Sequence, residues 1–223
     1  LKGIVGIDRP FENAQKYIHC ENGVLVVDNG EIKFKCHSPE FYSRNKSPIV
    51  FDLDAKCDRF LNDFLSNVLD TEDIVLLQKC FGLFLLGKNI DQKILILEGT
   101  GGTGKSTLSS IIAHLVGRQN ITQLRTDQLN QRFETSHYIG KTLLYGADVD
   151  SKFLQGTGAN KLKALTGGDF LTAELKGKDT FQIRGEFNIL ITSNQRLKIK
   201  FEQDEDAWKR RLFIISFKSK GKF

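Results

Sequence analysis

The sequence predicts an α/β protein with a mostly parallel sheet, preceded by a smaller region built from a hairpin and helices. Three observations lead to this prediction. After Lys93, apolar runs alternate with amphipathic helical segments, which is typical of a parallel sheet with helices on both faces. Before Lys93, an Asn-Gly pair separates two short runs, and from Cys57 onward the apolar residues recur with a helical period. We therefore divide the chain into a small accessory domain, residues 1–90, and a core, residues 91–223.

The accessory domain begins with the hairpin signal. Residues 23–27 and 31–35 are short runs on either side of Asp28-Asn29-Gly30, and both Asn and Gly accept the positive φ angles of a tight hairpin turn. The helical segment that follows has one apolar face, made of Phe60, Leu61, Phe64, Leu65, Val68 and Leu69. Thr71 is the expected N-cap of a second helix, which ends near Gly87.

The core shows the alternation of strands and helices. We expect buried strands at residues 94–97 and 187–193, further strands at 142–147 and 212–217, and helices at residues 105–116 and 158–166. Residues 171–176 and 179–184 flank Gly177 and predict a second hairpin.

Composition limits the class of protein. The chain has 223 residues, of which 40% are hydrophobic and 26% charged, as in ordinary soluble proteins, and no apolar run is long enough to cross a bilayer. We therefore expect a cytoplasmic protein, in a bacterial host, without a membrane partner. The start, Leu1-Lys2-Gly3, is neither an initiator methionine nor a signal peptide, so we expect a fragment of a longer protein.

The charge is distributed unevenly. Residues 1–90 hold 11 Lys and Arg against 13 Asp and Glu, whereas residues 91–223 hold 21 against 14, which gives net charges of −2 and +7. A basic core suggests an anionic partner such as nucleic acid, although many basic domains simply expose a solvated basic face.

The four cysteines, Cys20, Cys36, Cys57 and Cys80, form no C-x-x-C pair. Reduced thiols are the expected state. His19-Cys20 and Cys36-His37 would supply four zinc ligands, but adjacent residues of a strand point to opposite faces, which disfavours zinc.

The most specific pattern is a phosphate-binding loop. Residues 99–106 fit G-x-x-x-x-G-K-[ST] in full, between an apolar strand and an amphipathic helix. Backbone amides and the helix N-terminus would hold the phosphates of ATP, Lys105 would bridge the β- and γ-phosphates, and Ser106 would bind Mg²⁺. The predicted nucleotide-binding residues are Gly99, Thr100, Gly101, Gly102, Thr103, Gly104, Lys105, Ser106 and Thr107.

Polar residues follow two other strands at the edge where ligands bind in such sheets. Asp148 and Asp150 come just after the strand at 142–147; Asp148 would hold Mg²⁺, and Asp150 would orient or deprotonate the attacking water. Which acid does which is left open. Asn194 ends the strand at 187–193 and would position that water. Arg210 and Arg211 precede the last strand, and one of them would supply positive charge to a neighbouring subunit's transition state.

These motifs, in this order, resemble superfamily 3 helicases, and more narrowly the C-terminal helicase domain of phage, plasmid and island primase-helicases. The most specific stretch is Leu-Lys-Ala-Leu-Thr-Gly-Gly-Asp at 162–169, followed by Lys176-Gly177-Lys178 and Phe181. The segment 206–217 is similar to the family's arginine-finger strand, and the region before the phosphate loop is similar to its accessory domain. Departures are Asp148, where many relatives have Glu, and the lack of a primase signature.

The resemblance implies an AAA+-like core that assembles as a hexamer and threads DNA through its pore. Lys176 and Lys178 on the second hairpin would then bind phosphates of single-stranded or forked DNA, and Arg211, rather than Arg210, would be the preferred finger. Primase or other replication proteins would be partners.

Three functions compete. The first is an ATP-dependent DNA helicase or translocase that replicates a mobile element or virus. The second is an ATP-gated origin-binding or loading protein that does not itself unwind DNA. The third, a small-molecule kinase, shares the phosphate loop but has no use for the Thr166–Asp169 stretch.

Overall fold

A five-stranded parallel sheet forms the centre of the molecule. The structure, a computed structural model, describes residues 16–42, 45–156, 158–198 and 205–218. The strand order is β10-β4-β9-β6-β5 and all four pairings are parallel. The strands are β4 (Ile94–Glu98), β5 (Ile121–Gln123), β6 (Leu143–Gly146), β9 (Asn188–Ser193) and β10 (Leu212–Ser216). The predicted α/β class is confirmed.

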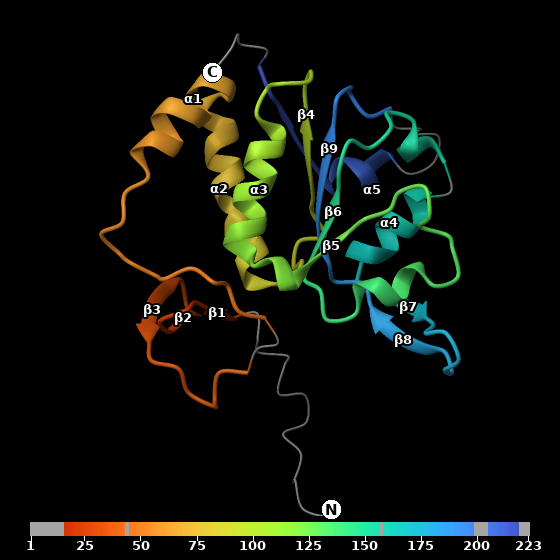
Figure 1. The fold of residues 1–223 in the computed structure, drawn as a ribbon, viewed down its shortest axis with the longest axis horizontal. Helices are drawn as coiled ribbons and strands as arrows, with labels where there is room; N and C mark the ends of the chain where they lie inside the picture. Colours follow the sequence, from red (N-terminus) through yellow and green to blue (C-terminus); the bar gives the residue numbers. More distant parts are fainter. Residues whose placement is uncertain (1–15, 43–44, 157, 199–204, 219–223) are drawn as a thin grey trace, which may run out of the picture.

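Helices cover both faces of this sheet (Figure 1). The helices α2 (Thr71–Leu86) and α3 (Lys105–Val116) lie on one face, whereas α4 (Gly158–Thr166) and α5 (Glu205–Lys209) lie on the other. Alternate residues of β4 serve the two cores: Leu95 and Leu97 pack with α2 and α3, and Ile94 and Ile96 pack towards α4 and α5. Because both faces of the sheet are covered, β4 and β9 are buried at every position, which explains the apolar runs at 94–97 and 189–191.

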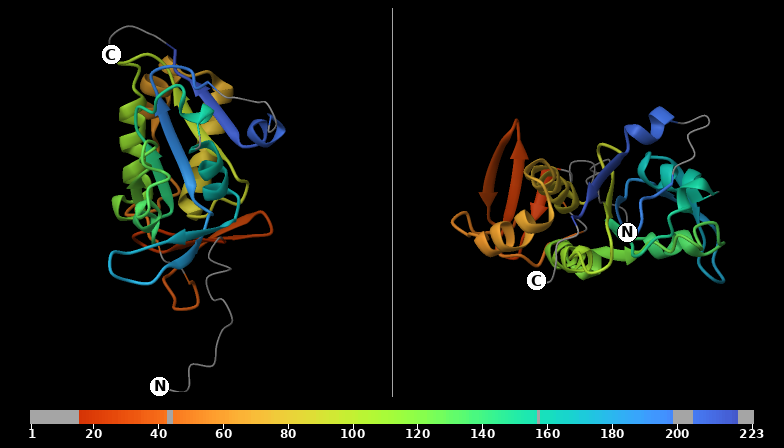
Figure 2. Two further views of the ribbon diagram at one scale, coloured as in Figure 1. Left: turned by 90° about the vertical axis from the view of Figure 1, so that its right-hand side faces the viewer. Right: turned by 90° about the horizontal axis from the view of Figure 1, so that it is seen from above.

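The predicted N-terminal hairpin is confirmed and has a third strand. Strands β1 (Tyr17–His19), β2 (Val24–Asp28) and β3 (Glu31–Lys35) form an antiparallel sheet in the order β1-β2-β3. Asp28 pairs with Glu31, so Asn29 and Gly30 form the turn, with φ of 47° and 83°. This small sheet lies outside the central sheet (Figure 2).

The helical pair differs from the prediction in detail. Its first segment is a π-helix, Arg59–Leu65, that continues into the single turn α1 (Ser66–Val68). The predicted N-cap at Thr71 is wrong by one residue, because Asp70 carries the extended backbone of the cap (ψ of 159°) and Thr71 is already helical. Gly87, with φ of 70°, ends α2 as predicted.

Helix α2 packs on the central sheet and also contacts β1 of the small sheet. Leu77, Cys80 and Phe84 share one core with Leu108 and Ile112 of α3. The domain boundary near residue 90 stays a prediction. Because α2 precedes this boundary and α3 follows it, their shared core packs across it.

The second hairpin is also confirmed. Strands β7 (Phe170–Ala173) and β8 (Phe181–Arg184) pair antiparallel, each shorter than predicted. They lie at the end of the molecule opposite the loop that joins β4 to α3 (Figure 1).

Candidate nucleotide site

The phosphate loop connects β4 to α3 as its sequence predicts. Gly99, Gly102 and Gly104 have φ of 150°, 80° and 95°, backbone angles that residues other than glycine rarely adopt. Gly104 is also the N-cap of α3, so the loop leads directly into a helix N-terminus. Ser106 and Thr107 are exposed in the first turn of that helix. Positive φ angles and a helix N-terminus are features that phosphate-binding loops share.

Lys105 lies folded over the loop. Its Nζ donates hydrogen bonds to the carbonyl oxygens of Gly99 at 2.6 Å and Thr100 at 2.9 Å, and its side chain is buried. Burial lowers the pKa of Lys105, and the nearby Asp148 carboxylate acts in the opposite direction. The effect of Asp148 on this pKa shows that its carboxylate lies within electrostatic reach of the lysine.

Asp148 and Asn194 are brought together from two neighbouring strands. The Asn194 Nδ2 donates to Asp148 Oδ1 at 3.2 Å. Asp148 has a positive φ of 46°, a strained conformation for a residue with a side chain, and its backbone N–H donates to Thr192 Oγ1 at 3.0 Å. Thr192 was not predicted, because a buried Thr in an apolar strand gives no sequence signal. The predicted juxtaposition of the acid and the Asn is thus present in the structure.

Asp150 has a local partner instead. Its Oδ1 accepts a hydrogen bond from the backbone N–H of Lys152 at 2.7 Å, and its side chain is exposed. The structure does not join Asp150 to Asp148 or Asn194 by a hydrogen bond, so its catalytic role stays a prediction.

The two arginines have different surroundings. Arg211 is buried, with 7% of its surface exposed, and its Nη1 donates to Ala207 O at 3.0 Å within the same chain. Arg210 is exposed. Only an exposed side chain can contact a neighbouring subunit, and Arg210, rather than the predicted Arg211, meets that condition; the finger role itself stays a prediction.

Lys176 and Lys178 are exposed on the turn of the β7–β8 hairpin, on either side of Gly177, whose φ is 74°. The base of the hairpin is closely packed: a Cβ on Gly185 would lie 1.9 Å from the carbonyl oxygen of Ala164 in α4. The backbone N–H of Gly168 donates to Gly185 O at 2.8 Å. The Thr-Gly-Gly-Asp stretch therefore ends α4 and sets the direction of the hairpin.

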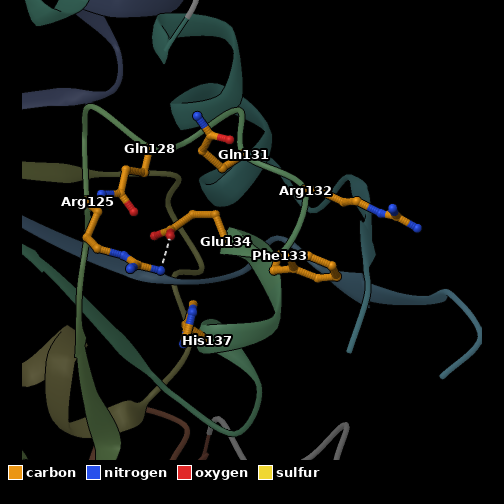
Figure 3. Close-up of a pocket in the computed structure, with 7 residues that line it drawn as sticks. All are labelled: Arg125, Gln128, Gln131, Arg132, Phe133, Glu134 and His137. Atoms are coloured by element: carbon orange, nitrogen blue, oxygen red, sulfur yellow. Dashed lines mark ion pairs between the residues drawn. The ribbon is translucent and has the colours of Figure 1, made fainter. Parts of the chain in front are cut away.

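A polar pocket of about 550 Å³ lies beside this hairpin and was not predicted (Figure 3). Its lining residues are Arg125, Gln128, Gln131, Arg132, Phe133, Glu134 and His137. They carry no recognised motif or periodic pattern that would have indicated a pocket.

Two ion pairs organise that pocket. Arg125 points to the buried Glu134, which also accepts a hydrogen bond from the Tyr138 hydroxyl at 2.8 Å. Burial, followed by this Glu134 contact, raises the pKa of Tyr138, so the phenol remains a donor. Arg132 points away from Glu134 and pairs in bidentate fashion with Glu174, just after β7, at 2.6 and 2.5 Å. The Arg132–Glu174 pair links the loop at 124–139 to the hairpin.

The oxygen ligands expected for Mg²⁺ are Ser106 and Asp148, and hard oxygen donors are what this ion prefers. Within the described residues there is no group of three or more His, Cys, Asp and Glu side chains arranged to hold a metal ion, and the four cysteines are free thiols. None of the helices in the described ranges has the length and apolar character that a bilayer crossing requires.

The chain is similar to one protein family and to a viral protein. The model of a family of unknown function, DUF5906, matches residues 97–211. A protein named "Putative helicase" from Acanthamoeba polyphaga mimivirus is 25% identical over 95% of this chain. The chain spans only 23% of the length of that relative.

Solved structures share the fold. One apo structure of the C-terminal region of NrS-1 matches with a TM-score of 0.59 and 13% identity, over 95% of this chain and 62% of that one. A second apo structure of that region, described as its A form, gives a TM-score of 0.57 and 18% identity, over 85% of this chain and 43% of that one. These structures show the fold alone, and the name of the mimivirus relative agrees with the helicase resemblance expected from the motifs.

Proposed function

The chain belongs to the DUF5906 family, whose function is unknown, and from that premise we propose that it is an ATP-driven DNA helicase motor of the superfamily 3 type. One observation carries the proposal. Lys105 of the phosphate loop, Asp148 and Asn194 come from three different segments and meet at the carboxyl edge of one parallel sheet. An acid and an amide beside a phosphate loop are the groups that hydrolysis of a nucleoside triphosphate requires.

Each residue has a specific task in the proposed hydrolysis. Lys105 exchanges its bonds to the carbonyls of Gly99 and Thr100 for bonds to the β- and γ-phosphates of ATP. Ser106 and Asp148 would hold Mg²⁺, and the bound ion would supply positive charge next to the phosphates. Asn194, fixed by its hydrogen bond to Asp148, orients the attacking water. Asp150 is the candidate to accept the proton of that water.

Two further features support DNA as the partner of the ATPase. Lys176 and Lys178 on the hairpin turn are flexible cations suited to a repeating phosphate backbone. Next to the hairpin, Phe133 is 41% exposed and Arg132 lies over its ring at 5.3 Å from the ring centre. An aromatic ring with an adjacent arginine suits stacking with unpaired bases. The hairpin and this loop therefore form one proposed DNA-binding face.

The relative from mimivirus adds support, because its name attributes helicase activity to a viral protein that is similar to this chain along most of this chain's length. We accordingly propose replication of a virus or mobile element as the biological role. Hexameric assembly with Arg210 reaching the neighbouring site, and cooperation with a primase, belong to the same proposal.

The rate of ATP hydrolysis with and without single-stranded DNA tests this function. We expect DNA to stimulate hydrolysis by the unaltered chain. Lys105→Ala should reduce hydrolysis at least about 100-fold, because it removes the cation that stabilises the transferred phosphate. A near-normal rate in this variant would refute the nucleotide site.

A pair of double variants tests the DNA part. Lys176→Ala with Lys178→Ala should abolish the stimulation by DNA and reduce the salt dependence of DNA binding. Lys33→Ala with Lys35→Ala removes the same charge at the same spacing from β3 and should leave the stimulation intact. If the unaltered chain and both double variants hydrolyse ATP at a steady rate that DNA does not change, the result would instead support an ATP-gated loading protein.

A further inference from the structure

An aromatic side chain from the accessory region lies against the phosphate loop. The ring of Phe64 packs on Gly104: a Cβ added to that glycine would lie 2.7 Å from Cε2 and 3.0 Å from Cζ of Phe64. Gly104 directly precedes Lys105 and is the N-cap of α3. The ring edge therefore touches the last residue of the loop before the helix that would bind the phosphates.

The backbone that presents Phe64 is unusual. Phe64 lies in the π-helix Arg59–Leu65, and the backbone N–H of Ser66 donates to the carbonyl of Leu61, five residues earlier. Leu65, with 2% of its surface exposed, anchors this segment in the core beside α3. Such π segments are rare and occur frequently at functional sites. The wide turn places the Phe64 ring at the loop while leaving it only half-buried.

The two ends of the phosphate loop leave different amounts of space for a bound nucleotide. At Gly99 the side chain and carbonyl of Phe217 close the loop, because a Cβ there would lie 3.0 Å from each. Phe217 itself is buried. At Gly104 the neighbour is Phe64, part of whose ring faces solvent. A nucleotide with its phosphates on the loop and the first turn of α3 must extend its base away from the closed end, and an aromatic ring is a surface on which a base stacks.

We propose that Phe64 forms the aromatic wall of a base-binding subsite at this nucleotide site, so that the loop binds the triphosphate and Phe64 binds the base. This inference rests on the proposed function, since it assigns a further residue to the same ATP site. It assigns a nucleotide-binding role to a residue outside the phosphate-loop motif, 35 positions before its first glycine.

Binding of two probes to the full 223-residue chain separates the base from the phosphates. Isothermal titration calorimetry would measure the affinity for Mg²⁺-ATP and for Mg²⁺-tripolyphosphate, which has no base. We expect Phe64→Ala to weaken ATP binding about tenfold, the loss of one stacking contact, and to leave tripolyphosphate binding unchanged. Phe64→Tyr should keep the ATP affinity, and Phe64→Leu, which retains apolar packing, should lose most of it.

Phe60→Ala is the matched control. Phe60 lies on the same π-helix, with its ring centre 5.9 Å from that of Phe64, and it too is only partly buried. This variant should bind both probes as the unaltered chain does. If Phe64→Ala weakens both probes equally, Phe64 only shapes the loop, and if it weakens neither, the ring is not in the site; either result overturns the inference alone. Failure of the unaltered chain to bind either probe would refute the nucleotide site itself.

Discussion

The hydrogen bond from Asn194 to Asp148 defines the residue-scale chemistry of the site, because it fixes the side chain proposed to orient the attacking water. Asn194→Ala should lower the hydrolysis rate about 100-fold, the usual cost of losing one positioned group at a reaction centre, while Mg²⁺-ATP affinity stays within about threefold. Single-turnover hydrolysis and equilibrium binding would separate the two effects. Asn67→Ala removes an exposed amide in α1 and should change neither; an unimpaired Asn194→Ala rate would remove Asn194 from the mechanism.

Two glycine substitutions should change stability in opposite directions. Gly185→Ala would place a Cβ 1.9 Å from Ala164 O, so the hairpin base must move, and we expect a loss of about 3 kcal/mol in the free energy of unfolding. Gly82→Ala, inside α2 with nothing within 4 Å of the new Cβ, should stabilise the chain by about 0.5–1 kcal/mol. Urea denaturation measures both. Equal stability of the Gly185→Ala variant would contradict the close packing of α4 on the hairpin.

At this scale the motifs were predictable because their chemistry depends on local spacing. The sequence predicts the phosphate loop, Asp148 and Asn194 as parts of one site, and the structure brings Asp148 and Asn194 into contact, while their catalytic roles stay predictions. Burial was not predictable in the same way. Two adjacent arginines look equivalent in sequence, and only the packing of α5 against β10 shows that Arg211 is enclosed and Arg210 exposed.

At the scale of elements, periodicity predicted what is long or fully buried. Helix α3 and helix α4 have the bounds expected from the sequence, and β4 and β9 agree within one residue. Strand β5 and helix α5 were missed because three and five residues carry too little pattern, and their structure depends on pairing and packing with distant segments. The π-helix was missed because its apolar spacing, Phe60 to Phe64, also fits an α-helix.

The packing of α2 predicts that its cysteine, Cys80, reacts slowly in the native protein. Burial raises the pKa of Cys80 to about 11, so at pH 8 almost none of it is thiolate, and 2% of its surface is exposed. Cys36 and Cys57 are exposed. Iodoacetamide at pH 8, followed by mass spectrometry, should modify Cys36 and Cys57 in the native protein but Cys80 only after denaturation. Rapid native modification of Cys80 would show that α2 does not pack stably on the sheet.

At the scale of the whole molecule, β9 connects the proposed DNA-binding hairpin to the proposed nucleotide site. The chain leaves the hairpin at Arg184, forms the buried strand Asn188–Ser193, and reaches Asn194 at the nucleotide edge. Six strand residues span roughly 20 Å. Strand β9 is buried throughout and paired with β4 and β6, so we expect it to be rigid. A displacement of the hairpin by DNA would therefore be transmitted along β9 to Asn194, whose amide is proposed to orient the water. The proposed coupling of DNA binding to hydrolysis needs such a connection.

The assembly supplies the most demanding test, because the arginine finger acts between subunits. Arg210→Ala alone should lower hydrolysis about 10³-fold. Mixed with Lys105→Ala, which is also inactive, it should regain activity, since an intact phosphate loop in one subunit then meets an intact Arg210 from the other. Hydrolysis measured across mixing ratios checks this.

Arg211→Ala is the matched control for that mixture. The Arg211 side chain is buried in its own subunit and hydrogen-bonded to Ala207, so this variant should lose thermal stability. Mixing it with Lys105→Ala should not restore ATP hydrolysis. The opposite pattern, with Arg211→Ala rescued by mixing and Arg210→Ala active alone, would return the finger to Arg211 and would require that side chain to leave its buried position when subunits meet. If neither arginine variant is rescued, the nucleotide site is completed within a single chain, and the ring is no longer needed to explain hydrolysis.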